Sequence, residues 1–242
     1  MTKTLAILIV AVAAAFPAAA TAALPHGSQP VNLDPADFTT KIDNKFWPMR
    51  PGSRWVYRDT DSEGARARDV VTVTHRTKLI ANGITARVVH DVVTEDGELA
   101  EVTDDYYAQD RAGNIWYLGE ATATYANGKP KSTEGSFEAG VDGAQPGVIM
   151  AARPRVGLHY RSEYYKGHAE DRARVMSLRQ MAGVPFGFFP RGRVLMTAET
   201  TPLEPQVLEY KFYARGVGPV LAVSVSGESD REELVRFRRG GK

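Results

Sequence analysis

Two histidines and two carboxylates are the residues whose types could do chemistry together. His75, His90, Asp105 and Glu120 lie on successive segments that are separated by turn dipeptides. Two imidazoles with a carboxylate can bind zinc or copper, and a buried carboxylate beside a histidine can act as a general base. The same residues could instead orient a bound ligand, or hydrogen-bond to one another within the fold. The sequence leaves these alternatives open. It predicts no cofactor, and any metal remains unknown.

Two turn dipeptides predict how the histidines face their neighbours. If Asn82-Gly83 is a two-residue hairpin loop, it places His75 opposite His90. Asp96-Gly97, treated in the same way, places His90 opposite Thr103. One β-bulge would change these pairings.

A third turn extends the prediction to the carboxylates. A four-residue loop over 110–113 places Tyr107 opposite Trp116 and Asp105 opposite Leu118. Side chains alternate between the two faces of a strand. One face of the sheet is therefore predicted to carry both aromatic residues together with the row formed by His75, His90, Thr103, Asp105 and Glu120.

The elements that must position these residues are short strands. The segments between the turns are rich in Val, Thr, Tyr and Trp, which favour strands. They span 69–79, 84–95, 98–109, 114–119, 122–126, 159–165, 172–181, 193–200, 207–214, 220–226 and 232–237. Residues 141–150 are predicted to be a long connecting loop. The fold is predicted to be all-β and mostly antiparallel, a single-domain curved sheet that forms either a half-open β-roll or a closed barrel.

Composition excludes several classes of protein. The 242-residue chain has no cysteine, which excludes disulfide scaffolds, thiol catalysis and cysteine zinc sites. Its 30 Lys and Arg balance 29 Asp and Glu, so the overall charge predicts no nucleic-acid partner.

The N-terminus reads as a targeting signal. Lys3 precedes an apolar run that ends in Ala20-Thr21-Ala22, the small-x-small pattern that precedes signal-peptide cleavage. The sequence predicts a signal peptide over 1–22, an extended lead-in over 23–45 and one β domain over 46–242. It therefore indicates a bacterial protein that is periplasmic or secreted, with no membrane span.

Three aromatic motifs resemble a family of uncharacterised bacterial exported β-proteins. They are Phe46-Trp47-Pro48-Met49-Arg50-Pro51-Gly52-Ser53-Arg54-Trp55-Val56-Tyr57, Val184-Pro185-Phe186-Gly187-Phe188-Phe189, and Tyr210-Lys211-Phe212-Tyr213-Ala214-Arg215-Gly216-Val217-Gly218. The family is similar in outline to curved β-roll proteins of the envelope, some of which carry lipophilic molecules. The resemblance implies a fold and an envelope location, and it transfers no catalytic residue.

The leading functional hypothesis is a non-catalytic protein that binds an amphipathic small molecule or lipid on its concave β-face. Tyr107, Trp116, Trp55 and Phe137 would supply apolar walls, while His90, Asp105 and Glu120 would orient the polar end. The alternatives are an interaction module with a filled core and a metal- or carboxylate-dependent hydrolase that uses His75, His90, Asp105 and Glu120. Protein partners cannot be predicted from the sequence.

Overall fold

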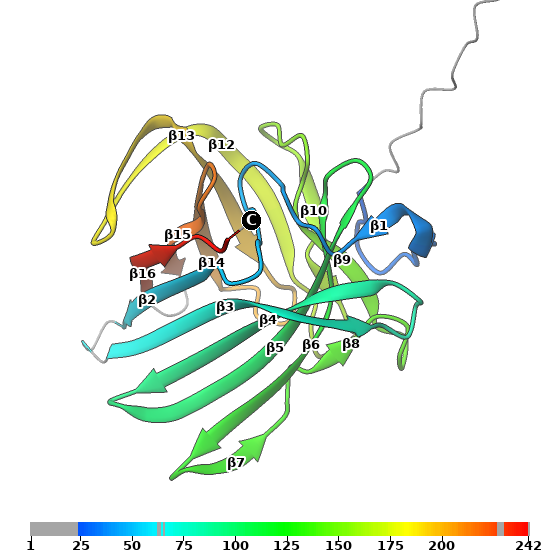
Figure 1. Cartoon of the computed structure of the whole chain (residues 1–242), viewed down its shortest axis with the longest axis horizontal. Coiled ribbons are helices and arrows are strands. Elements are labelled where there is room, and N and C mark those ends of the chain that lie inside the picture. Colours follow the sequence, from blue (N-terminus) through cyan, green and yellow to red (C-terminus); the bar gives the residue numbers. More distant parts are fainter. Residues whose placement is uncertain (1–23, 62–63, 65, 227–229, 242) are drawn as a thin grey trace, which may run out of the picture.

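The computed structural model describes residues 24–61, 64, 66–226 and 230–241. These residues form one antiparallel sheet that is nearly closed into a barrel, which confirms the predicted all-β single domain (Figure 1). A short 3-10 turn, Pro35–Asp37, precedes the first strand. The strands are β1 (Phe38–Thr39), β2 (Arg54–Thr60), β3 (Arg66–Leu79), β4 (Thr85–Glu95), β5 (Glu98–Asp110), β6 (Ile115–Ala126), β7 (Lys129–Ser132), β8 (Phe137–Glu138), β9 (Gln145–Met150), β10 (His159–Arg161), β11 (Glu163–Tyr164), β12 (Arg172–Val184), β13 (Gly187–Thr200), β14 (Leu208–Ala214), β15 (Gly218–Ser226) and β16 (Arg231–Arg238).

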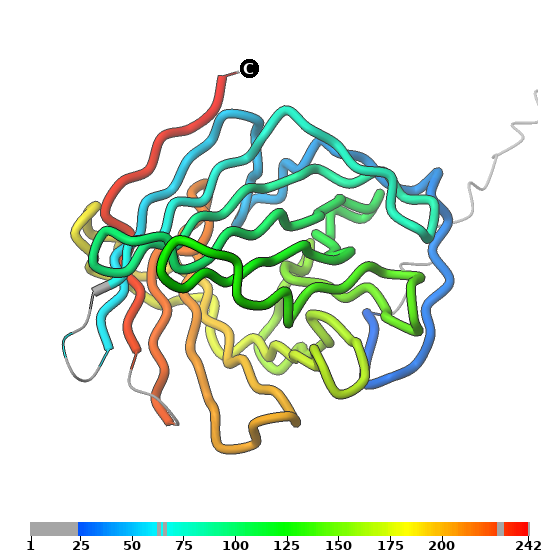
Figure 2. Tube along the Cα trace, turned by 90° about the horizontal axis from the view of Figure 1, so that it is seen from below, coloured from blue at the N-terminus to red at the C-terminus, as the bar shows by residue number. Residues whose placement is uncertain are grey.

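The sheet curls because its last strand returns to its first long one. Strand β16 pairs with β2, so the red and cyan parts of the chain lie side by side in Figure 2. On the other side of the barrel, β10 pairs with β12, and β11, which follows it at once, pairs with β9. Residues 159–164 thus link the two ends of the sheet.

The N-terminal lead-in packs against the outside of the barrel. Leu24, Val31, Leu33 and Phe38 contact a buried cluster that includes Trp116 on the outward face of the sheet. Arg161 is buried and donates hydrogen bonds to the carbonyls of residues 27 and 29 at 2.8 and 2.7 Å. The lead-in therefore covers the outward face around Trp116, and β6 begins with a run of five buried residues.

The predicted pairing of His75 with His90 is wrong. The Ile80 N–H donates to the Ile84 carbonyl at 2.9 Å, so the loop has three residues and ends on Gly83 at φ 87°. This is the type I turn with a glycine bulge, which shifts the register by one residue relative to a two-residue loop. A further bulge, between Val73 and Thr77, places His90 opposite Thr72.

The predicted pairings of β5 are also wrong. The Asp96-Gly97 turn forms as expected, but a bulge after Val93 places His90 opposite Asp104 rather than Thr103. The loop that follows β5 again has three residues, since the Asp110 N–H donates to the Asn114 carbonyl. The actual partners across β5 and β6 are Tyr107 with Tyr117, Ala108 with Trp116, and Asp105 with Glu120.

Two other predictions have different outcomes. The predicted loop over 141–150 is wrong in its second half, because Gln145–Met150 forms β9 and pairs with β6. The predicted signal peptide falls on residues 1–22, which lie outside the described residues. In the described part of the chain, no helix has the length and apolar character needed to cross a membrane.

Candidate functional site

The barrel encloses a cavity of about 830 Å³. One part of its wall is aromatic, with side chains from the N-terminal lead, β2, β5, β6 and β14: Trp47, Trp55, Tyr57, Tyr107, Tyr117 and Tyr213. The rings of Tyr107 and Tyr117 stack with their centroids 4.9 Å apart. The volume falls within the range of pockets that hold small organic molecules.

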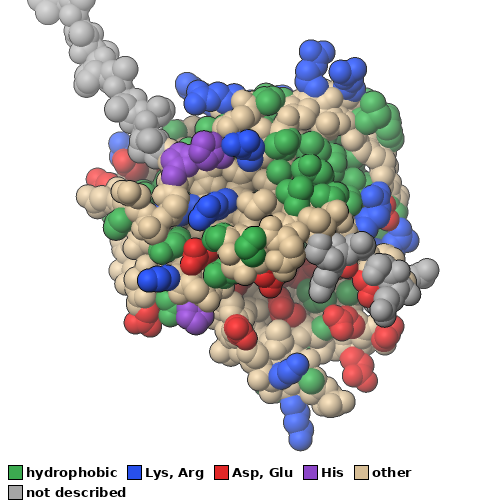
Figure 3. Space-filling view, turned by 180° about the vertical axis from the view of Figure 1, so that it is seen from behind, with side chains coloured by type: hydrophobic (Ala, Val, Ile, Leu, Met, Phe, Trp, Pro, Cys, Tyr) green, Lys and Arg blue, Asp and Glu red, His purple; other side chains and the backbone are tan. Residues whose placement is uncertain are grey.

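The rest of the wall is strongly acidic. Fourteen carboxylates line the cavity: Asp59, Asp61, Asp69, Asp91, Glu95, Asp96, Asp105, Glu120, Glu163, Asp171, Glu199, Glu209, Asp230 and Glu232. Among the described residues, Lys211 is the one basic side chain in this wall. In Figure 3, acidic side chains gather around a hollow in the lower half of the visible face.

Alternation along the strands explains why so many carboxylates face inward. Trp55, Tyr57 and Asp59 follow one another at every second position of β2, so all three point into the barrel. Glu232 lies directly opposite Asp59 on β16. Like charges that face each other across two strands destabilise the sheet unless something compensates them.

Asp69 and Asp91 form a carboxyl pair with unmet hydrogen-bonding capacity. Asp69 is only 6% exposed and shares a side-chain hydrogen bond with Asp91, which requires that one of the two is protonated. The Oδ1 atoms of Asp59, Asp69 and Asp91 are buried and have no partner among the described residues. Unpartnered buried carboxylate oxygens that face a cavity indicate a site for a donor or a cation.

A second carboxyl pair is bridged by a phenol. Tyr117 Oη lies 2.7 Å from Asp105 Oδ1 and 2.7 Å from Glu120 Oε2. A phenol donates only one hydrogen bond, so one of the two carboxyls must be protonated to satisfy both contacts. Burial raises the pKa of Asp105 well above its usual range and also raises that of Glu120, although the hydrogen bond from Tyr117 opposes both shifts.

Other carboxyls of the cavity also have raised pKa values, and two of them, Glu232 and Glu163, hold protons at neutral pH. Burial, together with neighbouring carboxylates, raises the pKa of Asp59 to about 6, that of Glu232 to about 8 and that of Glu163 to about 9. The cavity therefore lowers its own charge by protonation when no cation is present.

Lys211 shows how a cation is held in this environment. Its ammonium lies 2.9 Å from Glu199 Oε2 and 3.1 Å from Glu209 Oε2. Burial lowers the pKa of Lys211, but the two glutamates outweigh this effect and raise it well above the ordinary value. An ammonium group is thus strongly favoured beside these carboxylates.

Four of the seven predicted site residues line the cavity, and three do not. Trp55, Asp105, Tyr107 and Glu120 line the cavity, as does the unpredicted Tyr117. The remaining three, which are His90, Trp116 and Phe137, do not belong to its wall.

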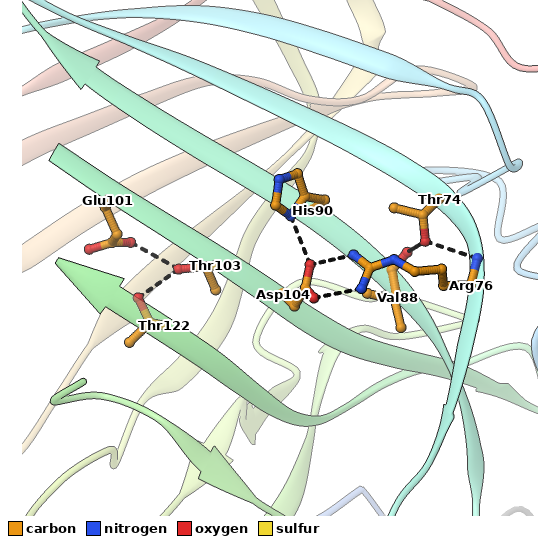
Figure 4. Close-up of polar contacts among 8 residues, drawn as sticks. All are labelled: Thr74, Arg76, Val88, His90, Glu101, Thr103, Asp104 and Thr122. Carbon is orange, nitrogen blue, oxygen red and sulfur yellow. Dashed lines mark hydrogen bonds and ion pairs between the residues drawn. The ribbon is translucent and has the colours of Figure 1, made fainter. Parts of the chain in front are cut away.

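Those three residues have other contacts. The His90 ring lies 2.8 Å from Asp104, on the outer face of the sheet (Figure 4). Trp116 is buried under the lead-in, where its indole N–H donates to Asp110 at 2.8 Å. Phe137 is buried and packs edge-on against Tyr117.

The metal site suggested by the two histidines does not form. His75 is exposed and does not face His90, while Asp105 and Glu120 point into the cavity. Over the described residues, no group of three or more His, Asp or Glu side chains is arranged to hold a metal ion.

The sequence carries one local signal for the acidic wall. The alternation of Trp55, Tyr57, Asp59 and Asp61 places aromatic and acidic side chains on one face of one strand. Asp91 points into the cavity because the bulge after Val93 pairs it with Thr103 and places His90 on the other face.

Comparison with known proteins gives no relative: no family model, no curated protein and no solved structure matches the chain.

Proposed function

We propose that the protein is an exported, non-catalytic binding protein that holds a small organic cation with an apolar body inside its barrel. The observation that carries this proposal is the composition of the cavity wall, with aromatic rings on one part and fourteen carboxylates on the rest. Aromatic faces and carboxylates both attract an ammonium group. The proposed ligand is amphipathic, as expected from the sequence, and its polar end is positively charged.

The same wall disfavours anionic lipids. A fatty acid in this cavity would place its carboxylate among groups of the same sign, in a region where charge is weakly screened. The hydrolase alternative has less support, since the four residues that it requires lie on opposite faces of the sheet. A filled core does not agree with a cavity of about 830 Å³.

Calorimetry with three ligands of equal chain length tests the proposal. At neutral pH, n-octylamine is a cation, octanoate is an anion and 1-octanol is neutral. We expect octylammonium to bind and octanoate not to bind, with octanol weaker than the amine. Equal or tighter binding of octanoate, or no binding of the amine, would overturn the proposal.

Two variants distinguish the effect of negative charge in the cavity from the effect of negative charge elsewhere on the protein. Asp69→Asn with Asp91→Asn should weaken octylammonium binding by at least about tenfold, because the removed charges face the ligand. Asp104→Asn removes one carboxylate from the outer face and should leave the affinity unchanged. A similar loss in both variants would place the ligand elsewhere.

Proton release gives an independent test. A cation beside Asp69, Glu163 and Glu232 favours their ionised forms, so binding should release protons. The heat of binding should then change with the ionisation enthalpy of the buffer. Identical heats in phosphate and Tris buffers would show that no carboxyl titrates on binding.

A further inference from the structure

The hairpin formed by β12 and β13 has two apolar faces, and only one of them is used in packing. Ala182 and Phe189 lie opposite each other and pack against the core of the barrel. At the turn, the Phe186 N–H donates to the Leu234 carbonyl at 2.9 Å, which fixes the tip to β16. The hairpin is therefore held in place by its inner face.

The outer face of the hairpin carries large apolar side chains with nothing over them. Phe188 pairs with Gly183 and is 67% exposed, and Met181, two residues before that glycine, is 50% exposed. Folding does not require these side chains, because the inner face already supplies the packing. Large exposed apolar residues that gather on one element mark an interaction surface.

The charge around this face has one sign. Between Arg172 and Ala198 the chain has five arginines and no lysine, aspartate or glutamate. Arg179, Arg191 and Arg193 are exposed, and no ion pair joins them to any described residue.

The neighbouring strands extend the basic surface. Arg54, Arg236 and Arg238 line a shallow groove of about 320 Å³ on the outside of β2 and β16. Strand β16 is the one that holds the hairpin tip, through Leu234 and through an edge-on contact between Phe186 and Phe237. In Figure 3 the charged side chains in the upper part of the visible face are mostly Lys and Arg, and a broad hydrophobic area lies among them.

We propose that this hairpin docks the protein on the surface of an anionic lipid membrane. Phe188 and Met181 would enter the headgroup boundary, while the arginines would contact lipid phosphates. A soluble polyanion without an apolar surface would satisfy the arginines, but it would leave two exposed apolar side chains at the tip without a role. The combination therefore favours a lipid surface.

Vesicle sedimentation tests this proposal with the full chain. We expect binding to vesicles that contain one third phosphatidylglycerol in phosphatidylcholine, and little binding to phosphatidylcholine alone. Arg191→Glu with Arg193→Glu should weaken binding by more than about twentyfold, since each arginine near an anionic surface contributes about fivefold. Lys129→Glu with Lys131→Glu, in the exposed strand β7, should have little effect.

The apolar tip has its own matched control. Phe188→Ser should weaken binding to the anionic vesicles, whereas Leu79→Ser, at a side chain that is 68% exposed on another hairpin, should not. Phe188→Trp should show a blue-shifted emission on anionic vesicles that Leu79→Trp does not show.

Three outcomes would overturn the proposal. One is equal binding to both kinds of vesicle, and another is no binding to either. The third is binding that depends on the arginines but not on Phe188, and that heparin competes away completely, since this would assign the surface to a soluble polyanion. None of these outcomes bears on ligand binding in the cavity, which octylammonium calorimetry measures separately.

Discussion

The inside of the barrel and its outside differ sharply in charge. Fourteen of the 29 acidic residues line the cavity with one of the 30 basic residues. Of the other side chains that the structure describes, 13 are acidic and 26 are basic. A formal net charge of +1 therefore conceals an acidic interior within a basic exterior. Net charge describes long-range behaviour, whereas the placement of the charges decides which ligand and which surface the protein can meet.

The largest difference in stability is expected between variants of two basic side chains, one facing the cavity and one on the outer face of the sheet. Lys211→Met should lower the free energy of unfolding by about 2–3 kcal/mol at pH 8, because it leaves Glu199 and Glu209 unpaired in the cavity. Arg76→Met breaks an ion pair on the outer face and should cost about 0.5–1 kcal/mol. Urea denaturation measures both. Equal losses of unfolding free energy in the two variants would show that ion pairs in the cavity and on the outer face contribute alike.

The pH dependence of stability should be set by the carboxyl groups of the cavity rather than by those on the surface. The pKa values of Asp59, Glu232 and Glu163 are raised to about 6, 8 and 9, so the folded state holds protons that the unfolded state releases. Stability should therefore be highest near pH 4–5 and should fall as the pH rises through these values. The slope should be at most about 1.4 kcal/mol per pH unit for each group.

Thermal unfolding of the ligand-free protein between about pH 5 and pH 9 checks this sign. Octylammonium should oppose the fall, since it compensates the ionised carboxylates. A melting temperature that rises over this range would contradict the raised pKa values.

Two adjacent aspartates, Asp104 and Asp105, should respond differently to replacement by asparagine, because the pKa of one is lowered and that of the other is raised. Asp104 accepts two hydrogen bonds from Arg76 on the outer face, at 2.9 and 2.7 Å. Burial raises its pKa, but the bonds from Arg76 and His90 outweigh this effect and lower it. Asp104→Asn should therefore destabilise the protein by about 1 kcal/mol at pH 8.

Asp105→Asn should be neutral or stabilising at the same pH. It removes a buried group of raised pKa beside Glu120, and its amide can still hydrogen-bond to Tyr117. Chemical denaturation of both variants decides the matter. Destabilisation by Asp105→Asn larger than that by Asp104→Asn would show that the inner carboxyl is a structural requirement.

The smallest effect is expected at the tip of the β12–β13 hairpin. Phe188→Ser should change the free energy of unfolding by less than about 0.5 kcal/mol, because the side chain is exposed. Phe189→Ser, on the inner face, should cost about 2 kcal/mol or more. A large cost at Phe188 would mean that it serves folding rather than docking.

Local chemistry in the sequence accounts for most of the strands and for two turns in detail. Asp96 and Asn127 adopt positive φ angles of 49° and 52° beside Gly97 and Gly128, as two-residue hairpin loops require. Alternation also places Trp55 and Tyr57 together on the inner face. These features depend on neighbours in sequence, so short-range reasoning can find them.

The residues of the candidate site depend on the register between neighbouring strands, which local sequence does not determine. Both a two-residue loop and a three-residue loop suit Asn82-Gly83, and the difference of one residue exchanges the faces of a strand. The bulge after Val93 moves His90 out of the predicted site and brings in Asp91. The three-residue loop after Asp110 replaces Trp116 with Tyr117.

The sequence by itself determined an antiparallel all-β chain with aromatic and acidic residues at alternate positions. Only the tertiary structure decided that β16 closes on β2, which brings Glu232 opposite Asp59 although they are far apart in sequence. Bulges and sheet closure are set by packing over the whole barrel, since each shifts many side chains together. The acidic cavity is consequently a property of the closed sheet, not of any one segment.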